Sequence, residues 1–254
     1  MKSVMADEQR IFYETNGYLV LPDVLSPEEL ARVREAADRA EQEWRRDPAR
    51  LGERREALQS VQAIIEYDPI FLDLLEHPRV FPIVREILGD DIALIDNDYY
   101  ITPPMHGPER HNAWHYDEGF TGVYHPRSTM MVKVFYALED VPEDGGPTAF
   151  VPGSHRYPLD FKMPVPSDID SMPGHVRMAV KAGTAYLFTG RMYHAALPNR
   201  SQKTRRVLIF NYGHVWMKPW QGYEPSERLK AAATTPVRKQ LLHAVPPYGS
   251  SLHD

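Results

Sequence analysis

Apolar and polar positions repeat with two different periods along this chain, helical in the first third and strand-like after about residue 91. Ser26, Pro27 and Glu29 carry the signature of a capping box, which fixes the start of one helix. Gly17 and Gly89 follow amphipathic stretches and are typical helix stops. The pattern predicts, in order, a helix over 7–16, a strand over 18–25, a helix over 26–46, and two helices over 69–76 and 79–88.

From Asp91 onward the chain consists of short runs of β-branched and aromatic residues. Turn sequences such as PEDGG, PGSH and KAGT separate these runs. Many short strands with polar turns are typical of a sandwich or barrel and argue against a parallel α/β sheet. The runs predict strands over 92–101, 129–138, 148–151, 175–180, 184–188 and 205–216.

One long connection, residues 157–174, contains prolines, acidic residues and apolar residues without a stable period. Loops of this length inside a compact domain are commonly functional. We expect this segment to cover the mouth of an active pocket as a lid, because its apolar residues would gain from burial there. The earlier loop over 102–113 is the alternative lid.

A length of 254 residues favours one domain over two. The expected division is a helical N-terminal part over about 1–90, a β core over about 91–216 and a C-terminal extension over 217–254. With 43% apolar residues, the chain can bury a substantial core. The formal net charge of −6 argues against general binding to nucleic acid or to anionic membranes.

What the chain lacks narrows its chemistry and its location. Cysteine is absent, which excludes disulfides, thiolate nucleophiles and cysteine-ligated metal sites, so any metal must be held by His, Asp or Glu. The first residues lack the apolar core of a signal peptide, and no apolar run is long enough to span a bilayer. We therefore expect a cytoplasmic enzyme or binding protein. Its oligomeric state is not indicated.

The triplet His115-Tyr116-Asp117 is the first candidate for metal binding. In an extended strand, residues two apart leave the backbone on the same side, so His115 and Asp117 can reach one ion while Tyr116 turns away. A third ligand must come from another strand end, and His194 follows an apolar strand in a suitable position. Two imidazoles and one carboxylate suit non-haem Fe(II). The triplet alone is a weak signal, since a loop histidine beside an acid is common.

Three segments strengthen this interpretation, because together they resemble the phytanoyl-CoA dioxygenase family. They are KVFYALEDVPEDGGPTAFVPGSHR at 133–156, FYETNGYLVLPDVLSPEELARVREA at 12–36 and HAALPNRSQKTRRVLIFNYG at 194–213. The resemblance covers roughly residues 8–215, in order and at normal spacing. It implies a mainly β fold, a double-stranded β-helix (a jelly-roll, cupin-like core) with flanking N-terminal helices.

The resemblance also implies a set of cofactors, namely Fe(II), 2-oxoglutarate and O2. It makes His115, Asp117 and His194 the iron ligands and the catalytic centre. Related halogenases replace the carboxylate with a small residue, so Asp117 argues against halogenation. His155, in the PGSH turn, resembles a ligand by residue type, but its position in the family indicates a role in shaping the turn.

The co-substrate carboxylate requires an arginine, whose planar fork pairs with it through two hydrogen bonds. Arg205 and Arg206 are neighbours on a strand and must point to opposite faces. The family places its arginine eleven residues after the distal histidine, which selects Arg205. Val207 and Ile209 should share the inward face with Arg205 and contact the substrate.

Weaker expectations follow from the same resemblance. Thr148 occupies a position whose hydroxyl bonds the co-substrate in relatives, and Asn112 stands where many relatives have a glutamine that contacts 2-oxoglutarate. An ordinary strand threonine and a loop asparagine are the alternatives. Tyr100 and Phe120 are the aromatic residues expected to line the substrate pocket, because they lie nearest to the ligands in the sequence pattern.

The function implied is hydroxylation of a small organic metabolite, with release of succinate and CO2. The same oxidative chemistry used for desaturation, epimerisation or cyclisation is an alternative that the ligands do not distinguish. A catalytically silent jelly-roll binding module is the alternative from another class, and the intact set of ligands with Arg205 speaks against it. No basic cluster is placed to bind the phosphates of CoA, so a substrate without CoA is expected.

Overall fold

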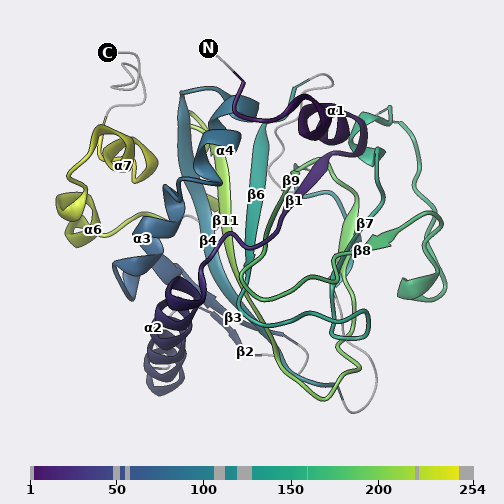
Figure 1. The fold of residues 1–254 in the computed structure, drawn as a ribbon, viewed down its shortest axis with the longest axis horizontal. Helices are drawn as coiled ribbons and strands as arrows, with labels where there is room; N and C mark the ends of the chain where they lie inside the picture. The colour runs from purple at the N-terminus through teal and green to yellow at the C-terminus, as the bar shows by residue number, and fades with distance from the viewer. Residues whose placement is uncertain are drawn as a thin grey trace.

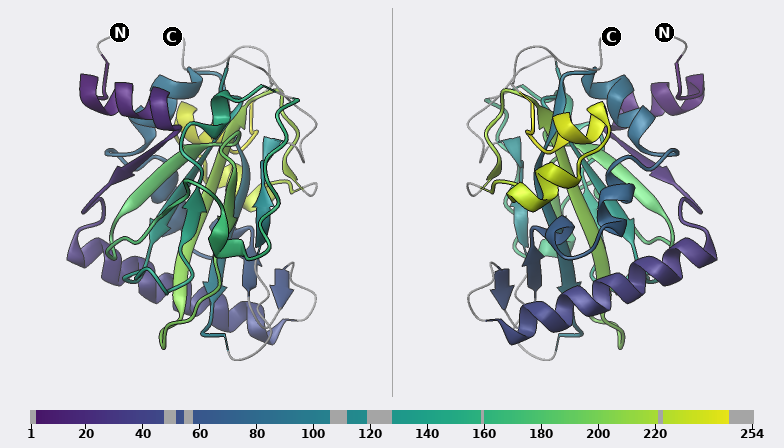
Figure 2. Two further views of the ribbon diagram at one scale, coloured as in Figure 1. Left: turned by 90° about the vertical axis from the view of Figure 1, so that its right-hand side faces the viewer. Right: turned by 90° about the vertical axis from the view of Figure 1, so that its left-hand side faces the viewer.

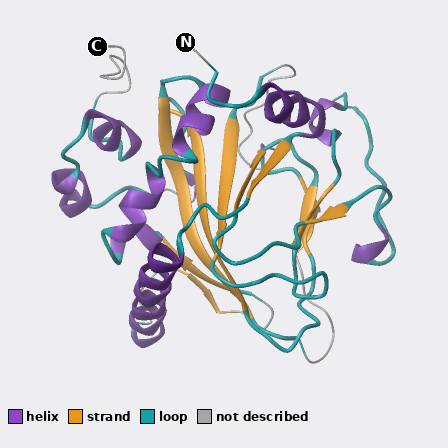
Figure 3. Cartoon of the chain, viewed as in Figure 1, coloured by secondary structure: helices purple, strands orange, loops and turns teal. Residues whose placement is uncertain are grey.

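The computed structural model of the chain describes residues 3–47, 52–54, 58–105, 112–118, 128–158, 160–220 and 223–245. Two antiparallel sheets face each other across the centre of the molecule (Figures 1 and 3). In spatial order, the large sheet contains β1 (Tyr18–Leu21), β9 (Ala185–Thr189), β6 (Met131–Ala137), β11 (Arg205–His214), β4 (Ile92–Thr102), β3 (Gln59–Gln62) and β2 (Gly52–Arg54). The small sheet contains β5 (Asn112–His115), β10 (His194–Ala196), β7 (Thr148–Phe150) and β8 (Val176–Arg177).

This arrangement confirms the expected jelly-roll fold. Most helices cover the face of the large sheet that points away from the small sheet, as the two side views show (Figure 2). Among the described residues, the chain forms α1 (Asp7–Asn16), α2 (Pro27–Arg46), α3 (Ile70–Leu75), α4 (Phe81–Leu88), α6 (Glu227–Ala232) and α7 (Pro236–Leu241). None of the described helices combines the length and the apolar character needed to cross a membrane.

Alternation along the large sheet gives its two faces different partners. Leu208, Phe210 and Tyr212 of β11 point outward and pack in the main core under the helices. Val207 and Ile209 point inward and pack with aromatic residues between the two sheets. The outer face therefore carries most of the apolar burial that holds the fold, whereas the inner face builds the candidate site.

The predicted capping box at the start of α2 is confirmed. The Ser26 hydroxyl accepts a hydrogen bond from the Glu29 N–H at 3.2 Å, and the Glu29 carboxylate accepts one from the Ser26 N–H at 2.8 Å. Val33, Ala37 and Trp44 follow on the buried face of the helix. The cap therefore fixes where the buried stripe of α2 begins.

Replacing Ser26 with alanine should lower the free energy of unfolding by about 1 kcal/mol, because the Glu29 N–H loses its acceptor. Urea unfolding followed by circular dichroism measures the change. Ser167→Ala, at an exposed serine in segment 157–174, is the matched control and should stay within about 0.5 kcal/mol of the wild type. Equal stability of the wild type and Ser26→Ala would contradict the role of the cap.

The helices predicted in the first part and the strands predicted from residue 92 onward all form, with bounds shifted by a few residues. The sequence pattern did not predict the short strands β2, β3, β5 and β10, or the C-terminal helices α6 and α7. Strands β1 and β3 come from the helical N-terminal part, yet they join the large sheet. The division into one domain with boundaries near residues 90 and 216 stays a prediction.

The lid expected over residues 157–174 is placed differently. Ile169, in the middle of this segment, packs with Ala149, Ala195 and Leu197, and its carbonyl accepts a hydrogen bond from Trp114 Nε1 at 2.9 Å. These residues alternate with the inward-facing ones, so they lie on the outer face of the small sheet. The prediction that the segment covers the metal ligands is therefore wrong for the part around Ile169. Residues 106–111 of the alternative loop, 102–113, lie outside the described residues.

Candidate metal centre

Strand pairing brings the two predicted histidine ligands together. His115 at the end of β5 is the direct cross-strand partner of His194 on β10, and their ring centroids lie 4.3 Å apart. Asp117 follows two residues after His115, and Tyr116 turns away to pack on Tyr193. One potential ligand atom from each of His115, Asp117 and His194 lies within 4.8 Å of the others.

The hydrogen bonds of the imidazoles define which nitrogen faces the centre. Nδ1 of His115 contacts the Ala113 carbonyl at 2.6 Å, and Nδ1 of His194 contacts the Met192 carbonyl at 2.8 Å. A carbonyl oxygen accepts but never donates, so each Nδ1 carries a proton and Nε2 is the nitrogen left to bind a metal. The Nε2 atoms face Asp117, at 3.5 Å from Oδ1 for His115 and 3.4 Å from Oδ2 for His194.

The protonation of the centre suits a cation. Burial lowers the pKa of His194 to about 3, which keeps its imidazole neutral at physiological pH. Burial also opposes ionisation of Asp117, but Lys133, His194 and His115 together outweigh this effect and hold the pKa of that carboxyl below its usual range. Two imidazoles and one carboxylate therefore converge on one point. This donor set fits Fe(II) and leaves metal positions open for other ligands.

Arg205 lies inside the sandwich, buried, near the same strands. Its Nη2 donates hydrogen bonds to the Thr148 hydroxyl at 3.0 Å and to the Tyr186 hydroxyl at 3.3 Å, and these hydroxyls are 3.0 Å apart. Its Nε is buried without a hydrogen-bond partner, and within the described part of the chain no carboxylate lies within ion-pair distance. A buried guanidinium without a counter-ion is costly, so this group is built to receive an anion.

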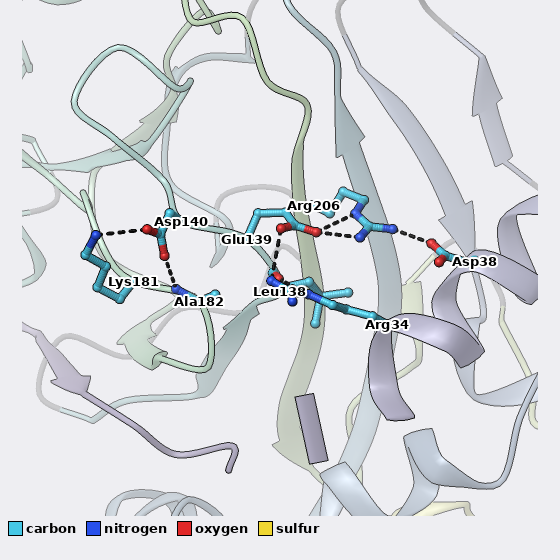
Figure 4. A network of polar contacts seen from close by, with 8 residues as sticks. All are labelled: Arg34, Asp38, Leu138, Glu139, Asp140, Lys181, Ala182 and Arg206. Carbon is cyan, nitrogen blue, oxygen red and sulfur yellow. Dashed lines mark hydrogen bonds and ion pairs between the residues drawn. The ribbon is translucent and has the colours of Figure 1, made fainter. Parts of the chain in front are cut away.

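Arg206 points the other way, as alternation requires. Its guanidinium binds Glu139 and Asp38 on the outer face of the large sheet, and Arg34 joins the same network through Glu139 at 3.0 Å (Figure 4). Asp38 and Arg34 come from α2, so these ion pairs attach that helix to the sheet. The structure therefore separates the two neighbouring arginines into an inner one near the candidate centre and an outer one in a structural network.

The other expected site residues have mixed outcomes. Val207, Ile209 and Tyr100 lie in the cluster between the sheets, together with Phe135 and Phe188. Phe120 falls outside the described residues, as does the side chain of Asn112, so those two expectations stay predictions. His155 lies away from the ligand set, with Nε2 3.3 Å from the Glu14 carbonyl.

Two inward-facing residues were not anticipated. Tyr186 of β9 completes the hydroxyl pair around Arg205, and Lys133 of β6 places Nζ 2.9 Å from Asp117 Oδ2. Both occur in apolar strand sequences, where a tyrosine is expected to be core and a lysine to face solvent. Strand alternation with a fixed register would have shown that they face inward.

The model of the phytanoyl-CoA dioxygenase (PhyH) family matches residues 13–207 of this chain. This protein belongs to that family. Its members are Fe(II)- and 2-oxoglutarate-dependent dioxygenases that use O2, and this chain is such an enzyme.

Individual relatives of this dioxygenase agree with the family match. L-proline trans-4-hydroxylase from Streptomyces griseoviridis is 22% identical over 258 residues, which cover 91% of this chain and 94% of the relative. HygX from Streptomyces hygroscopicus, solved with nickel, 2-oxoglutarate and hygromycin B, superposes with a TM-score of 0.69 at 18% identity, covering 85% of this chain and 90% of HygX. The carbocyclase SnoK from nogalamycin biosynthesis also gives 0.69, at 23% identity, covering 85% of this chain and 87% of SnoK. These structures show the shared fold.

Proposed function

We propose that this dioxygenase hydroxylates a small organic molecule at a centre in which His115, Asp117 and His194 hold Fe(II). Arg205 binds the distal carboxylate of 2-oxoglutarate in this proposal. The observation that carries it is the buried guanidinium of Arg205, which lacks a counter-ion among the described residues and lies beside the strands of the ligand set.

The register of the small sheet supports a single cavity for both groups. Thr148, which contacts Arg205, pairs with Ala196, and Phe150 pairs with His194 two residues along the same strands. Two residues of strand span about 7 Å, which is of the order of a five-carbon dicarboxylate. A 2-oxoglutarate molecule anchored at Arg205, Thr148 and Tyr186 can therefore reach the ligand set with its other end.

The residues of this chain have defined tasks in the reaction. Bound Fe(II) supplies the activation of O2 that is coupled to oxidation of 2-oxoglutarate to succinate and CO2. His115, Asp117 and His194 hold the metal from one side and leave its remaining positions to co-substrates. Arg205 neutralises and orients the co-substrate, and Phe135, Phe150 and Phe188 exclude water from the interior.

Hydroxylation is supported by the hydroxylase relative, L-proline trans-4-hydroxylase, which matches nearly the full length of both chains. The named activities of the structural neighbours include carbocyclisation and epimerisation, so the same fold hosts other oxidative outcomes. A substrate that is not a CoA ester and a cytoplasmic location remain part of the proposal.

The test is a screen for substrate-stimulated conversion of 2-oxoglutarate. With Fe(II), air and pools of small metabolites, at least one pool should raise succinate formation well above the substrate-free rate. Mass spectrometry of that pool should then show a product heavier by one oxygen atom. Anaerobic reactions are the control and should give no succinate. A product of unchanged mass would indicate epimerisation instead of hydroxylation. A product lighter by two hydrogen atoms would indicate desaturation or cyclisation.

A further inference from the structure

A row of polar residues crosses the inner face of the large sheet beside the candidate metal centre. Register pairs Asp96 of β4 with Asn211 of β11, and Asn211 with Lys133 of β6. Asn211 Nδ2 donates a hydrogen bond to Asp96 Oδ2 at 2.7 Å. Burial raises the pKa of Asp96, and the nearby charge of Lys133 opposes this rise.

Lys133 projects from this row towards the opposite sheet. Its ammonium lies 2.9 Å from Asp117 Oδ2 as an ion pair. The ring centroids of Trp220 and Phe135 lie 5.2 Å and 5.9 Å from Nζ, within the range of cation–π attraction. The Asp117 carboxylate and two aromatic rings thus surround the buried ammonium and restrict where it can point.

Apolar residues flank this polar row on β6 and β11. The inward positions next to Lys133 and Asn211 are Met131, Phe135, Ile209 and Gly213. Replacing a buried ion pair with apolar residues of similar volume is often neutral or stabilising. A lysine among these apolar neighbours is therefore better explained by its contact with Asp117 than by packing.

We propose that Lys133 is a positioning residue. Its ion pair with Asp117 Oδ2 leaves Asp117 only the other oxygen to bind a metal ion. This inference rests on the proposed metal centre. A carboxylate held at one oxygen by an ammonium binds a cation through one atom, which keeps a coordination position open for a co-substrate. Asp96 and Asn211 lie in the same cross-strand row as Lys133, and Asn211 binds Asp96.

Lys133→Met, which keeps the length and removes the charge, is the decisive variant. Without the ammonium, both oxygens of Asp117 become available to the metal. The variant should bind Co(II) at least as tightly as the wild type, and the visible absorption of the Co(II) form should weaken as the coordination number rises. Turnover of 2-oxoglutarate should fall by about 10- to 100-fold. Lys133→Arg, which keeps the charge, should retain most of the wild-type spectrum.

The matched control is Lys181→Met, which removes an exposed lysine paired with Asp140 and should change neither the spectrum nor turnover. Thermal unfolding of each variant identifies any loss of fold. An unchanged Co(II) spectrum in Lys133→Met, with or without a raised KM for substrate, would overturn the proposal. So would a joint loss of Co(II) binding and thermal stability, because that result assigns a structural role. A wild type that binds no Co(II) would instead contradict the metal centre itself.

Discussion

Replacing Asp117 with alanine should abolish 2-oxoglutarate turnover, the largest effect expected of any single substitution in this enzyme. Asp117 supplies the sole carboxylate of the ligand set, and two imidazoles alone do not hold Fe(II) in a fixed geometry. The fold should survive, because Lys133 keeps Asp96 as a nearby opposite charge. Succinate formation measures the activity, and circular dichroism measures the fold.

Asp140→Ala is the control for this substitution. Asp140 pairs with Lys181 in an exposed ion pair, so its removal should leave succinate formation at the wild-type rate. Asp117→Asn, which keeps the volume of the side chain, should be as inactive as Asp117→Ala. Turnover that persists in both Asp117 variants without added halide would rule out Asp117 as a ligand.

The second large effect is expected at Arg205. Arg205→Ala should raise the KM for 2-oxoglutarate by roughly 30- to 5,000-fold, because loss of one partner from a buried charge pair costs about 2–5 kcal/mol. Thr148 and Tyr186 remain, but two hydroxyls do not neutralise a carboxylate. The KM is measured from succinate formation over a range of 2-oxoglutarate concentrations.

Arg206→Ala is the natural companion, since the two residues differ by one position along β11. Its loss removes ion pairs to Glu139 and Asp38, so the thermal midpoint should fall while the KM for 2-oxoglutarate stays unchanged. The reverse pattern, with a raised KM for Arg206→Ala alone, would mean that the outer arginine binds the co-substrate.

The sequence predicted those helices and strands whose signals extend over many residues. The capping box of α2 and the apolar run of β11 gave correct elements, because their signals extend over several residues. Strands β5 and β10 contain only a few residues, and pairing rather than propensity forms them. The convergence of His115, Asp117 and His194 was expected from alternation and from the family resemblance, and the structure brings these residues together.

The missed features depend on contacts between segments far apart in the sequence. Lys133 and Asp96 become neighbours through their shared partner Asn211, a relation that no local pattern contains. The segment around Ile169 was expected to cover the mouth of the active pocket. The small residues Ala149 and Ala195 instead leave an uncovered apolar surface on the outer face, which this segment fills. That surface is visible only when strand register is known.

Strands β5 and β10 carry the candidate metal ligands on one face and contact an outer segment of the chain with the other face. His115 and His194 face the interior, while the adjacent Trp114 and Ala195 contact the part of the outer segment around Ile169. Changes in length or composition of that outer segment can therefore accumulate during divergence without displacing either imidazole. A single-residue insertion inside β5 would instead disrupt the candidate site. It would exchange the two faces of the strand and place tryptophan where histidine now faces the interior.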